Sequence, residues 1–235
     1  MGLTVTIHQP HYLPWVGYVD KVDRADCFVI LDTVQFSKNG WQNRNRIKTA
    51  AGPQWLTVPV HRRAGRPLAE VTVDGHAGWG RKHRHALEVN YEGAPFFARH
   101  RGFFEALYGR AWDRLLDLNL EAFAYLAAAL GLRTPSILAS SLGVPGTATE
   151  RLVAICRALG ADTYLAGAGG HGYLDRRLFE EAGIAVCVQD FACPRYPQRF
   201  GEFVADLSAV DLLFNCGDES LARLRAARAR PVTGP

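Results

Sequence analysis

Short apolar segments alternate with helix-length segments at both ends of this 235-residue chain. Residues 3–7 and 27–31 are rich in apolar and β-branched side chains, and residues 15–26 between them repeat apolar side chains at helical spacing. Strands that alternate with helices in this way are typical of parallel βαβ units. The rhythm returns near the other end, with predicted strands at 136–140, 163–167 and 184–188 and predicted helices at 149–159 and 176–182.

The middle of the chain departs from this rhythm. Residues 54–60 and 68–74 alternate polar and apolar side chains and predict an antiparallel hairpin. Helical spacing of apolar residues predicts three helices, at 79–91, 95–108 and 112–131, with Gly131 as the terminator of the last.

These patterns predict an α/β fold class: a mostly parallel Rossmann-like sheet with flanking helices, plus a small β-hairpin and helical lobe. We expect one domain over residues 1–235. Its α/β core would come from 1–36 and 133–216, and the lobe would be inserted at about 50–132. The tail after Arg223 is rich in alanine and arginine and closes with PVTGP, so its end is expected to be frayed.

The composition bears on where the protein works. The longest strongly apolar stretch, residues 116–132, is interrupted by polar and acidic side chains, so no membrane partner is expected. The first ten residues lack the pattern of a secretory signal. The five cysteines are odd in number and show neither a CxxC pair nor zinc-ligand spacing, which favours reduced thiols and no metal site. We therefore predict a cytoplasmic protein.

Polar side chains follow two of the predicted strands. His8 ends the first strand, and Asp32 and Gln35 follow the second. Ligands of open parallel sheets bind at the carboxyl ends of the strands, so these side chains are expected to converge there. The spacing of His8 and His11 before a helix is similar to the HxxH loop of nucleotidylyltransferase-like enzymes, although Pro10 replaces the usual glycine. We expect His11 itself to point into solvent.

A basic segment at residues 37–48, SKNGWQNRNRIK, contains no acid. Its arginines can each hold a phosphate or carboxylate through two parallel hydrogen bonds, and Trp41 can stack on a planar group. The alternative is a solvated charge run on the surface. We favour an anion-binding segment because amide side chains are interleaved with its cations, which are Lys38, Arg44, Arg46 and Lys48.

Two glycine-containing segments stand before predicted helices. At 146–151, Thr147 and Glu150 have the spacing of a capping box, and we favour that structural role over a phosphate seat. At 167–173, the sequence GAGGHGY allows a ligand to approach the backbone, but its spacing is not GxGxxG, so a dinucleotide site is not predicted.

The opening IHQPHYLPWVGYVDKVDRADCFVILDTVQFSKNGWQNRNRIK resembles that of the WbqC-like protein family, and further matching stretches extend the resemblance over nearly the whole chain. The resemblance implies an accessory enzyme of surface-polysaccharide or specialised metabolism that modifies an amino sugar or amine. The family commonly has asparagine at the position of His11, and a basic residue is more usual within 167–173, where His171 would replace it. The other motif residues are His8, Gln9, Pro10, Tyr12, Pro14, Trp15, Asp32, Gln35, Phe36, Trp41, Gln42, Asn43, Arg44, Lys48, His83 and Tyr91.

The leading functional prediction is a biosynthetic transferase that joins an activated acyl or aminoacyl group to an amine of a sugar or specialised-metabolite precursor. His8 would be the general base, because an imidazole can accept a proton at neutral pH. Asp32 would orient that imidazole or bind the amine. The predicted substrate-binding residues are Gln9, Tyr12, Trp15, Gln35, Lys38, Trp41, Gln42, Asn43, Arg44, Arg46, Lys48, His83, His171 and Tyr173.

Two alternatives stay open at this stage. One is a nucleotidylyltransferase-like enzyme that uses a nucleoside triphosphate, and the other is a non-catalytic module that binds phosphate or nucleic acid. The expected partner is a phosphorylated or nucleotide-linked small molecule, with tRNA and a coenzyme A thioester as candidate donors. The sequence identifies no cofactor and no oligomeric state.

Overall fold

A computed structural model describes residues 2–37, 39–61, 67–172 and 174–228. Its main sheet has five strands in the order β5-β2-β1-β6-β7, and every pairing is parallel. The α/β class and the parallel sheet are therefore as predicted. The first strand of the chain is the central one, because Val5 is in register with Cys27 on one side and with Tyr164 on the other. The strands are β1 (Thr4–His8), β2 (Cys27–Ile30), β5 (Ser136–Leu138), β6 (Thr163–Ala166) and β7 (Ala185–Val188).

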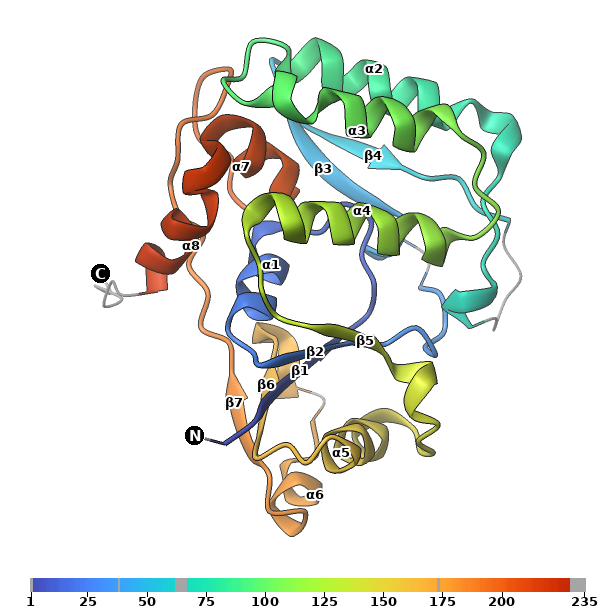
Figure 1. The fold of residues 1–235 in the computed structure, drawn as a ribbon, viewed down its shortest axis with the longest axis vertical. Coiled ribbons are helices and arrows are strands. Elements are labelled where there is room, and N and C mark those ends of the chain that lie inside the picture. Colours follow the sequence, from blue (N-terminus) through green and yellow to red (C-terminus); the bar gives the residue numbers. More distant parts are fainter. Residues whose placement is uncertain (1, 38, 62–66, 173, 229–235) are drawn as a thin grey trace.

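Helices cover both faces of this sheet (Figure 1). On one face, α1 (Val16–Asp23) and α4 (Leu115–Leu130) bring Tyr18 and Phe123 onto Phe28 of β2. On the other face lie α5 (Ala148–Ala158) and α6 (Arg176–Glu181), where the Phe179 ring stacks on Tyr164. Because both faces are covered, the short strands can be apolar almost throughout.

The helical lobe agrees with the sequence prediction. It contains α2 (Trp79–Tyr91), α3 (Phe97–Gly109) and α4, which begins at Leu115, three residues later than predicted. Helix α4 ends at the predicted terminator, because Gly131 is its C-cap and has a left-handed φ of 78°. Short 3-10 helices connect the larger elements: η1 (Leu68–Glu70), η2 (Gly75–Ala77), η3 (Ala139–Leu142), η4 (Ala168–Gly172) and η5 (Gly217–Glu219).

The hairpin is present, but its strands are not the predicted pair. The structure pairs β3 (Arg44–Thr49) with β4 (Gly52–Thr57), so part of the basic segment is a strand. The usual apolar alternation is hidden because one inward side chain is Asn45, which donates to the carbonyl of Leu13 at 2.6 Å. Of the predicted pairing, residues 58–61 do lie along 71–74, with a single antiparallel bridge between Val60 and Val73.

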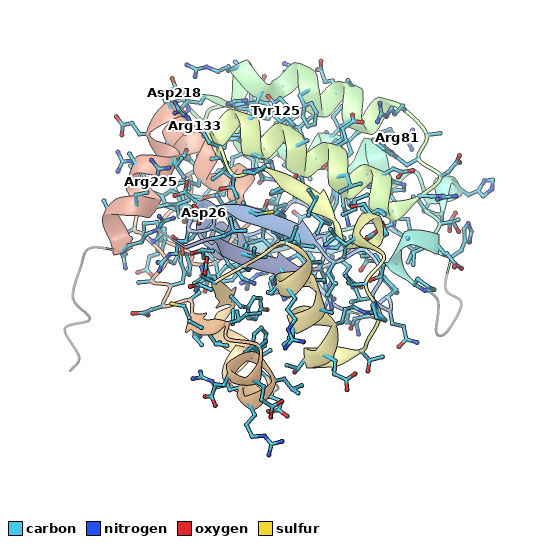
Figure 2. All side chains as sticks on the ribbon, turned by 60° about the horizontal axis from the view of Figure 1, so that its bottom comes forward. Asp26, Arg81, Tyr125, Arg133, Asp218 and Arg225 are labelled. Atoms are coloured by element: carbon cyan, nitrogen blue, oxygen red, sulfur yellow. The ribbon has the colours of Figure 1, made fainter. Side chains whose placement is uncertain are left out.

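Two helices near the end of the chain were not predicted. They are α7 (Ala209–Cys216) and α8 (Ser220–Arg228), and the end of the tail, where fraying was expected, lies outside the described residues. Arg225 and Arg228 of α8 form ion pairs with Asp23 and Asp20 of α1. Figure 2 shows Arg225 and Asp218 on this side of the molecule, opposite Arg81 of α2.

Within the described ranges, no helix has both the length and the apolar character needed to cross a bilayer.

Candidate functional site

A cavity of about 830 Å³ opens at the carboxyl edge of the parallel sheet. The segments that follow four of the five strands contribute to it, which is where ligands of such sheets bind. The remaining walls come from α1, α5, β3, the loop that precedes β3, and Asp206 in the segment before α7. The polar residues and glycines of the lining include His8, Gln9, His11, Lys21, Arg46, Arg151, Gly167 and Gly169.

His8 is the last residue of β1 and lines the cavity. Its Nδ1 lies 3.1 Å from the main-chain oxygen of Gln9. A carbonyl oxygen only accepts, so Nδ1 carries the hydrogen and Nε2 of the neutral ring keeps the lone pair. Burial, Lys21 and His11 lower the pKa of His8 well below its ordinary value, while the bond to Gln9 opposes this shift. The ring is therefore uncharged at neutral pH.

His11 also lines the cavity, so the expectation that it points into solvent is wrong. Only 7% of it is exposed, and its ring centroid lies 4.6 Å from that of His8. Burial, with a smaller contribution from Lys21, lowers the pKa of His11 to about 3. Its Nδ1 has no hydrogen-bond partner among the described residues. A buried polar atom without a partner inside a cavity is available to a ligand.

Lys21 was not predicted, and it is the most unusual charged residue at the site. It sits on α1, is only 3% exposed, and donates from Nζ to the carbonyl of Ile7 at 2.9 Å. Burial lowers the pKa of its ammonium group from 10.5 to about 7. A signal was present in the sequence, because Lys21 stands four residues after Gly17 on the helix face that meets the first strand.

An aromatic and cationic rim, which we call the tryptophan rim, stands beside the cavity. It consists of Trp41, Trp55, Arg44 and Arg46, and its two tryptophans are 37% and 43% exposed. The indole centroids are 5.4 Å apart, and the Arg44 guanidinium lies 4.3 Å from the ring of Trp55. Trp41 and Arg46 also line the cavity itself. Trp55 was missed because it was assigned to the wrong hairpin.

Arg151, on the first turns of α5, supplies the second arginine of the cavity. Its Nε donates to the carbonyl of Gly146 at 2.8 Å, and its Nη1 donates to the hydroxyl of Thr33 at 3.1 Å. Thr147 is the N-cap, as predicted, but its side chain makes no capping hydrogen bond, so the capping box is not formed.

Asp32 does not line the cavity. It is buried, and its Oδ1 accepts a hydrogen bond from the backbone nitrogen of Ser140 at 3.0 Å. Its neighbour Leu31 faces the cavity instead, which reflects the alternation of side chains at the end of a strand. The hydrogen bonds of the described residues include none between the Asp32 carboxylate and His8. They therefore do not support the predicted role of Asp32 in orienting the imidazole.

Several other predicted binding residues are engaged inside the protein. Lys48 is buried, and its ammonium group donates to the side chain of Gln198 at 3.1 Å and to the main chain of Glu202. Asn43 donates to the carbonyl of Val58 at 2.8 Å. The polar groups of Lys48 and Asn43 thus have hydrogen-bond partners inside the fold, and neither residue lines the cavity.

His83 and Tyr12 form a second buried network. The Tyr12 hydroxyl lies 2.8 Å from Nδ1 of His83 and 2.6 Å from the hydroxyl of Tyr108. Burial lowers the pKa of His83 to about 4. This network packs the helical lobe against the loop after β1 and does not reach the cavity.

Gln42 acts on the cavity indirectly. Its Nε2 donates to Oε1 of Gln9 at 2.9 Å, and its Oε1 accepts from the backbone nitrogen of Ser37 at 2.7 Å. Gln42 thereby positions Gln9, which does line the cavity. Gln35 is exposed and forms a backbone bridge with Pro67.

Of the predicted site residues, the cavity brings together His8, Gln9, Trp15, Trp41 and Arg46. The backbone of His171 belongs to η4, directly after the lining residues Gly167 and Gly169, but its side chain lies outside the described part. Lys38 and Tyr173 lie outside the described residues altogether. In the ranges that the structure covers, no three His, Cys, Asp or Glu side chains are grouped so as to hold a metal ion.

Comparison with known proteins gives a family but no activity. Residues 9–223 match the family described as WbqC-like protein family. An uncharacterised protein of Mycobacterium tuberculosis, Rv1507c, is 36% identical over 228 residues, which cover 95% of this chain and 98% of that protein. No solved structure matches.

Proposed function

We propose that this chain, which belongs to the WbqC-like protein family, is a transferase that joins an activated acyl or aminoacyl group to an amine of a sugar or specialised-metabolite precursor. One observation carries the proposal: an uncharged imidazole, His8, lines the same cavity as two arginines, Arg46 and Arg151. The imidazole is a proton acceptor, and the arginines can hold the anionic part of a donor.

The amine nitrogen would attack the carbonyl carbon of the donor. As the new C–N bond forms, Nε2 of His8 takes a proton from the nitrogen, and the bond to the leaving group breaks with its electron pair. The leaving group is a thiolate, a phosphate or the ribose oxygen of a tRNA, and it can receive that proton. His8 suits this task because its Nδ1 is held by Gln9, which leaves Nε2 as the base.

Anion binding would fall to Arg46 and Arg151 rather than to the whole basic segment. Arg46 stands at the rim end of the cavity, beside Trp55, and Arg151 stands at α5. Because they come from two different elements that both line the cavity, β3 and α5, they could hold a donor at two points. The tryptophan rim would stack on a planar part of the donor, such as a nucleobase.

Nucleotidylyl transfer is a second candidate, and the topology favours it. In the sheet order β5-β2-β1-β6-β7, His8 ends the central strand, and His11 lies between that strand and α1. The centroids of the two imidazole rings are 4.6 Å apart. In HxxH-loop enzymes, histidines at this place donate to phosphates. This function requires a nucleoside triphosphate and releases pyrophosphate.

The non-catalytic module has less support. Lys48 and Asn43 are buried and bonded to protein groups, so the basic segment presents fewer free groups to a phosphate backbone than its sequence indicated. Such a module also has no need of an imidazole that is buried in a cavity with one lone pair directed away from the main chain.

One screen tests the three functions. Thermal stability is measured with coenzyme A thioesters, nucleoside triphosphates with Mg²⁺, nucleotide sugars and aminoacyl-tRNA, since a ligand at 100 times its Kd stabilises the fold by about 2.7 kcal/mol. Hits are then incubated with amines, and products are identified by mass spectrometry. Amide formation without pyrophosphate supports acyl transfer, and pyrophosphate release supports nucleotidylyl transfer. Salt-sensitive binding without turnover would overturn both enzymatic proposals.

A further inference from the structure

Lys21 is a buried amine without a carboxylate partner. Among the described residues no acidic side chain forms an ion pair with it, and its Nζ donates to the main-chain oxygen of Ile7. The acids nearest to it in sequence are engaged elsewhere: Asp20 pairs with Arg24 and Arg228, and Asp23 pairs with Arg225. A neutral carbonyl acceptor does little to stabilise a buried ammonium ion.

Burial favours the uncharged form of Lys21. His8 ends β1, His11 lies in the loop that follows, and Tyr18 lies on the same helix as Lys21, with its ring 4.9 Å from His8 and 5.0 Å from His11. Both imidazoles are coupled electrostatically to Lys21, as their lowered pKa values show. With the pKa of Lys21 itself at about 7, a substantial fraction carries a free lone pair at neutral pH.

Gly167 leaves room beside this amine. It follows β6 and lines the cavity, and a Cβ built at this position would lie 3.8 Å from Nζ of Lys21. The backbone of Gly167 is not in the left-handed region, so its conformation does not demand a glycine. The absent side chain instead keeps open a space next to the nitrogen, on the cavity side.

We propose that Nζ of Lys21 forms an imine with the carbonyl carbon of a small aldehyde or ketone bound in this cavity. Nζ attacks the carbonyl carbon, and a proton moves from nitrogen to oxygen to give a carbinolamine. Loss of the hydroxyl group as water then leaves a C=N bond, and hydrolysis returns both the amine and the carbonyl compound. His8, which adjoins the same cavity, can carry the proton between nitrogen and oxygen. This activity is separate from acyl transfer.

Reductive trapping tests the proposal on the intact protein. Pyruvate and benzaldehyde are the probes, each with sodium cyanoborohydride near neutral pH, and labelled peptides are identified by mass spectrometry. Lys82 is the internal control, because it is exposed on α2. Lys21 should be labelled at least about ten times faster than Lys82, since an ordinary lysine with a pKa near 10.4 is almost fully protonated at this pH. Equal or slower labelling of Lys21 would overturn the imine.

Two alanine variants make a matched pair. Gly167→Ala places a methyl group in van der Waals contact with Nζ and fills the space beside it, whereas the Cβ of Gly169→Ala, in the lining of the same cavity, lies within 4 Å of nothing. We expect labelling of Lys21 to fall at least about fivefold in Gly167→Ala and to be unchanged in Gly169→Ala, because the tetrahedral carbinolamine needs the space that a Cβ removes. Equal labelling of the two variants would refute a carbonyl site beside Gly167.

A further variant and the transferase assay separate the two proposals. Lys21→Met removes the amine with a side chain of similar length, and circular dichroism checks that it folds. Trapping requires no acyl donor, so a failure of imine formation leaves the acyl-transfer proposal standing, and the reverse also holds. We expect the folded Lys21→Met protein to carry no label on the peptide that contains position 21, and to carry the same label on Lys82 as the wild type.

Discussion

His8 owes its chemistry to two local contacts. The carbonyl of Gln9 fixes the hydrogen on Nδ1, and burial, with smaller contributions from Lys21 and His11, lowers the pKa of the ring so that it stays uncharged. The side chain of Gln9 is in turn held by Gln42, so a residue from the loop before β3 supports the neighbour of His8. The proposed proton acceptor thus stands beside main-chain and amide groups.

Replacement of His8 by alanine is expected to lower turnover by about 100-fold or more, because the attacking amine loses its proton acceptor. Steady-state kinetics on the donor and amine found by the ligand screen measure the effect. His76→Ala is the control, since His76 is exposed on η2 and lies outside the cavity. Unchanged turnover in a folded His8→Ala protein would remove His8 from the reaction.

The burial of Lys21 makes the stability depend on pH. Its folded pKa is about 7, against 10.5 for the ordinary group, so the unfolded chain binds the extra proton over that interval. The free energy of unfolding should therefore rise with pH from about 7 to 10, by up to about 1.4 kcal/mol per unit from this residue. Urea denaturation of the wild type and of Lys21→Met checks this, and the variant should lack that part of the slope. Parallel pH profiles for the two proteins would contradict it.

At the residue scale, the sequence predicted some of the side chains that line the cavity and missed others. His8 was predicted because polar residues at the end of a first parallel strand belong to a ligand edge, and Trp41 because it lies among the cations and amides of the basic segment. Asp32 fails to reach the cavity because strand alternation turns Leu31 toward it instead. Lys21 was missed because a lysine within a helix ordinarily points to solvent.

At the scale of elements, the β3–β4 hairpin explains the rim. No strand was predicted within the basic segment 37–48, because its buried side chains include Asn45 and Lys48, which bond to other groups across the fold. A pattern that counts only apolar residues cannot detect such a strand. The helices of the lobe, by contrast, have apolar stripes that face one core, and their positions were predicted to within a few residues.

The tryptophan rim should contribute to ligand affinity. Trp55→Ala removes the ring beneath Arg44 and Arg46, and the loss of a stacked contact raises the Kd of a nucleotide-containing donor by about tenfold, or about 1.4 kcal/mol. Isothermal titration measures this. Val89→Ala is the control, because Val89 is an exposed apolar residue on α2. Equal affinities for the two variants would argue against stacking at the rim.

The α8 helix should stabilise α1 through Asp20. That carboxylate is 0% exposed and accepts from Arg228 and from Gln189. Arg228→Ala leaves a buried charge with fewer partners, so we expect a loss of about 1–3 kcal/mol in the free energy of unfolding. Arg223→Ala, which breaks a pair with Glu219 on the surface, should cost less than about 1 kcal/mol. Chemical denaturation compares them, and equal losses would show that Asp20 does not depend on α8.

At the scale of the whole molecule, the alternation of strands and helices predicted the fold class and the parallel sheet. It could not predict the strand order, which depends on contacts between segments more than a hundred residues apart. The cavity has the same long-range origin, since its walls come from both ends of the chain and from the hairpin. A sequence pattern within one segment does not indicate which distant segments will pack against it.

The central position of β1 has a consequence for biosynthesis. A ribosome releases residues 4–8 near the start of translation, but the β6 edge that completes their pairing, beginning at Thr163, emerges only after most of the polypeptide. Throughout that interval the nascent chain presents one unpaired strand edge, the kind of surface that chaperones bind. The loop that follows β1 and lines the cavity thus matures late, although it is among the first parts of the protein to be made.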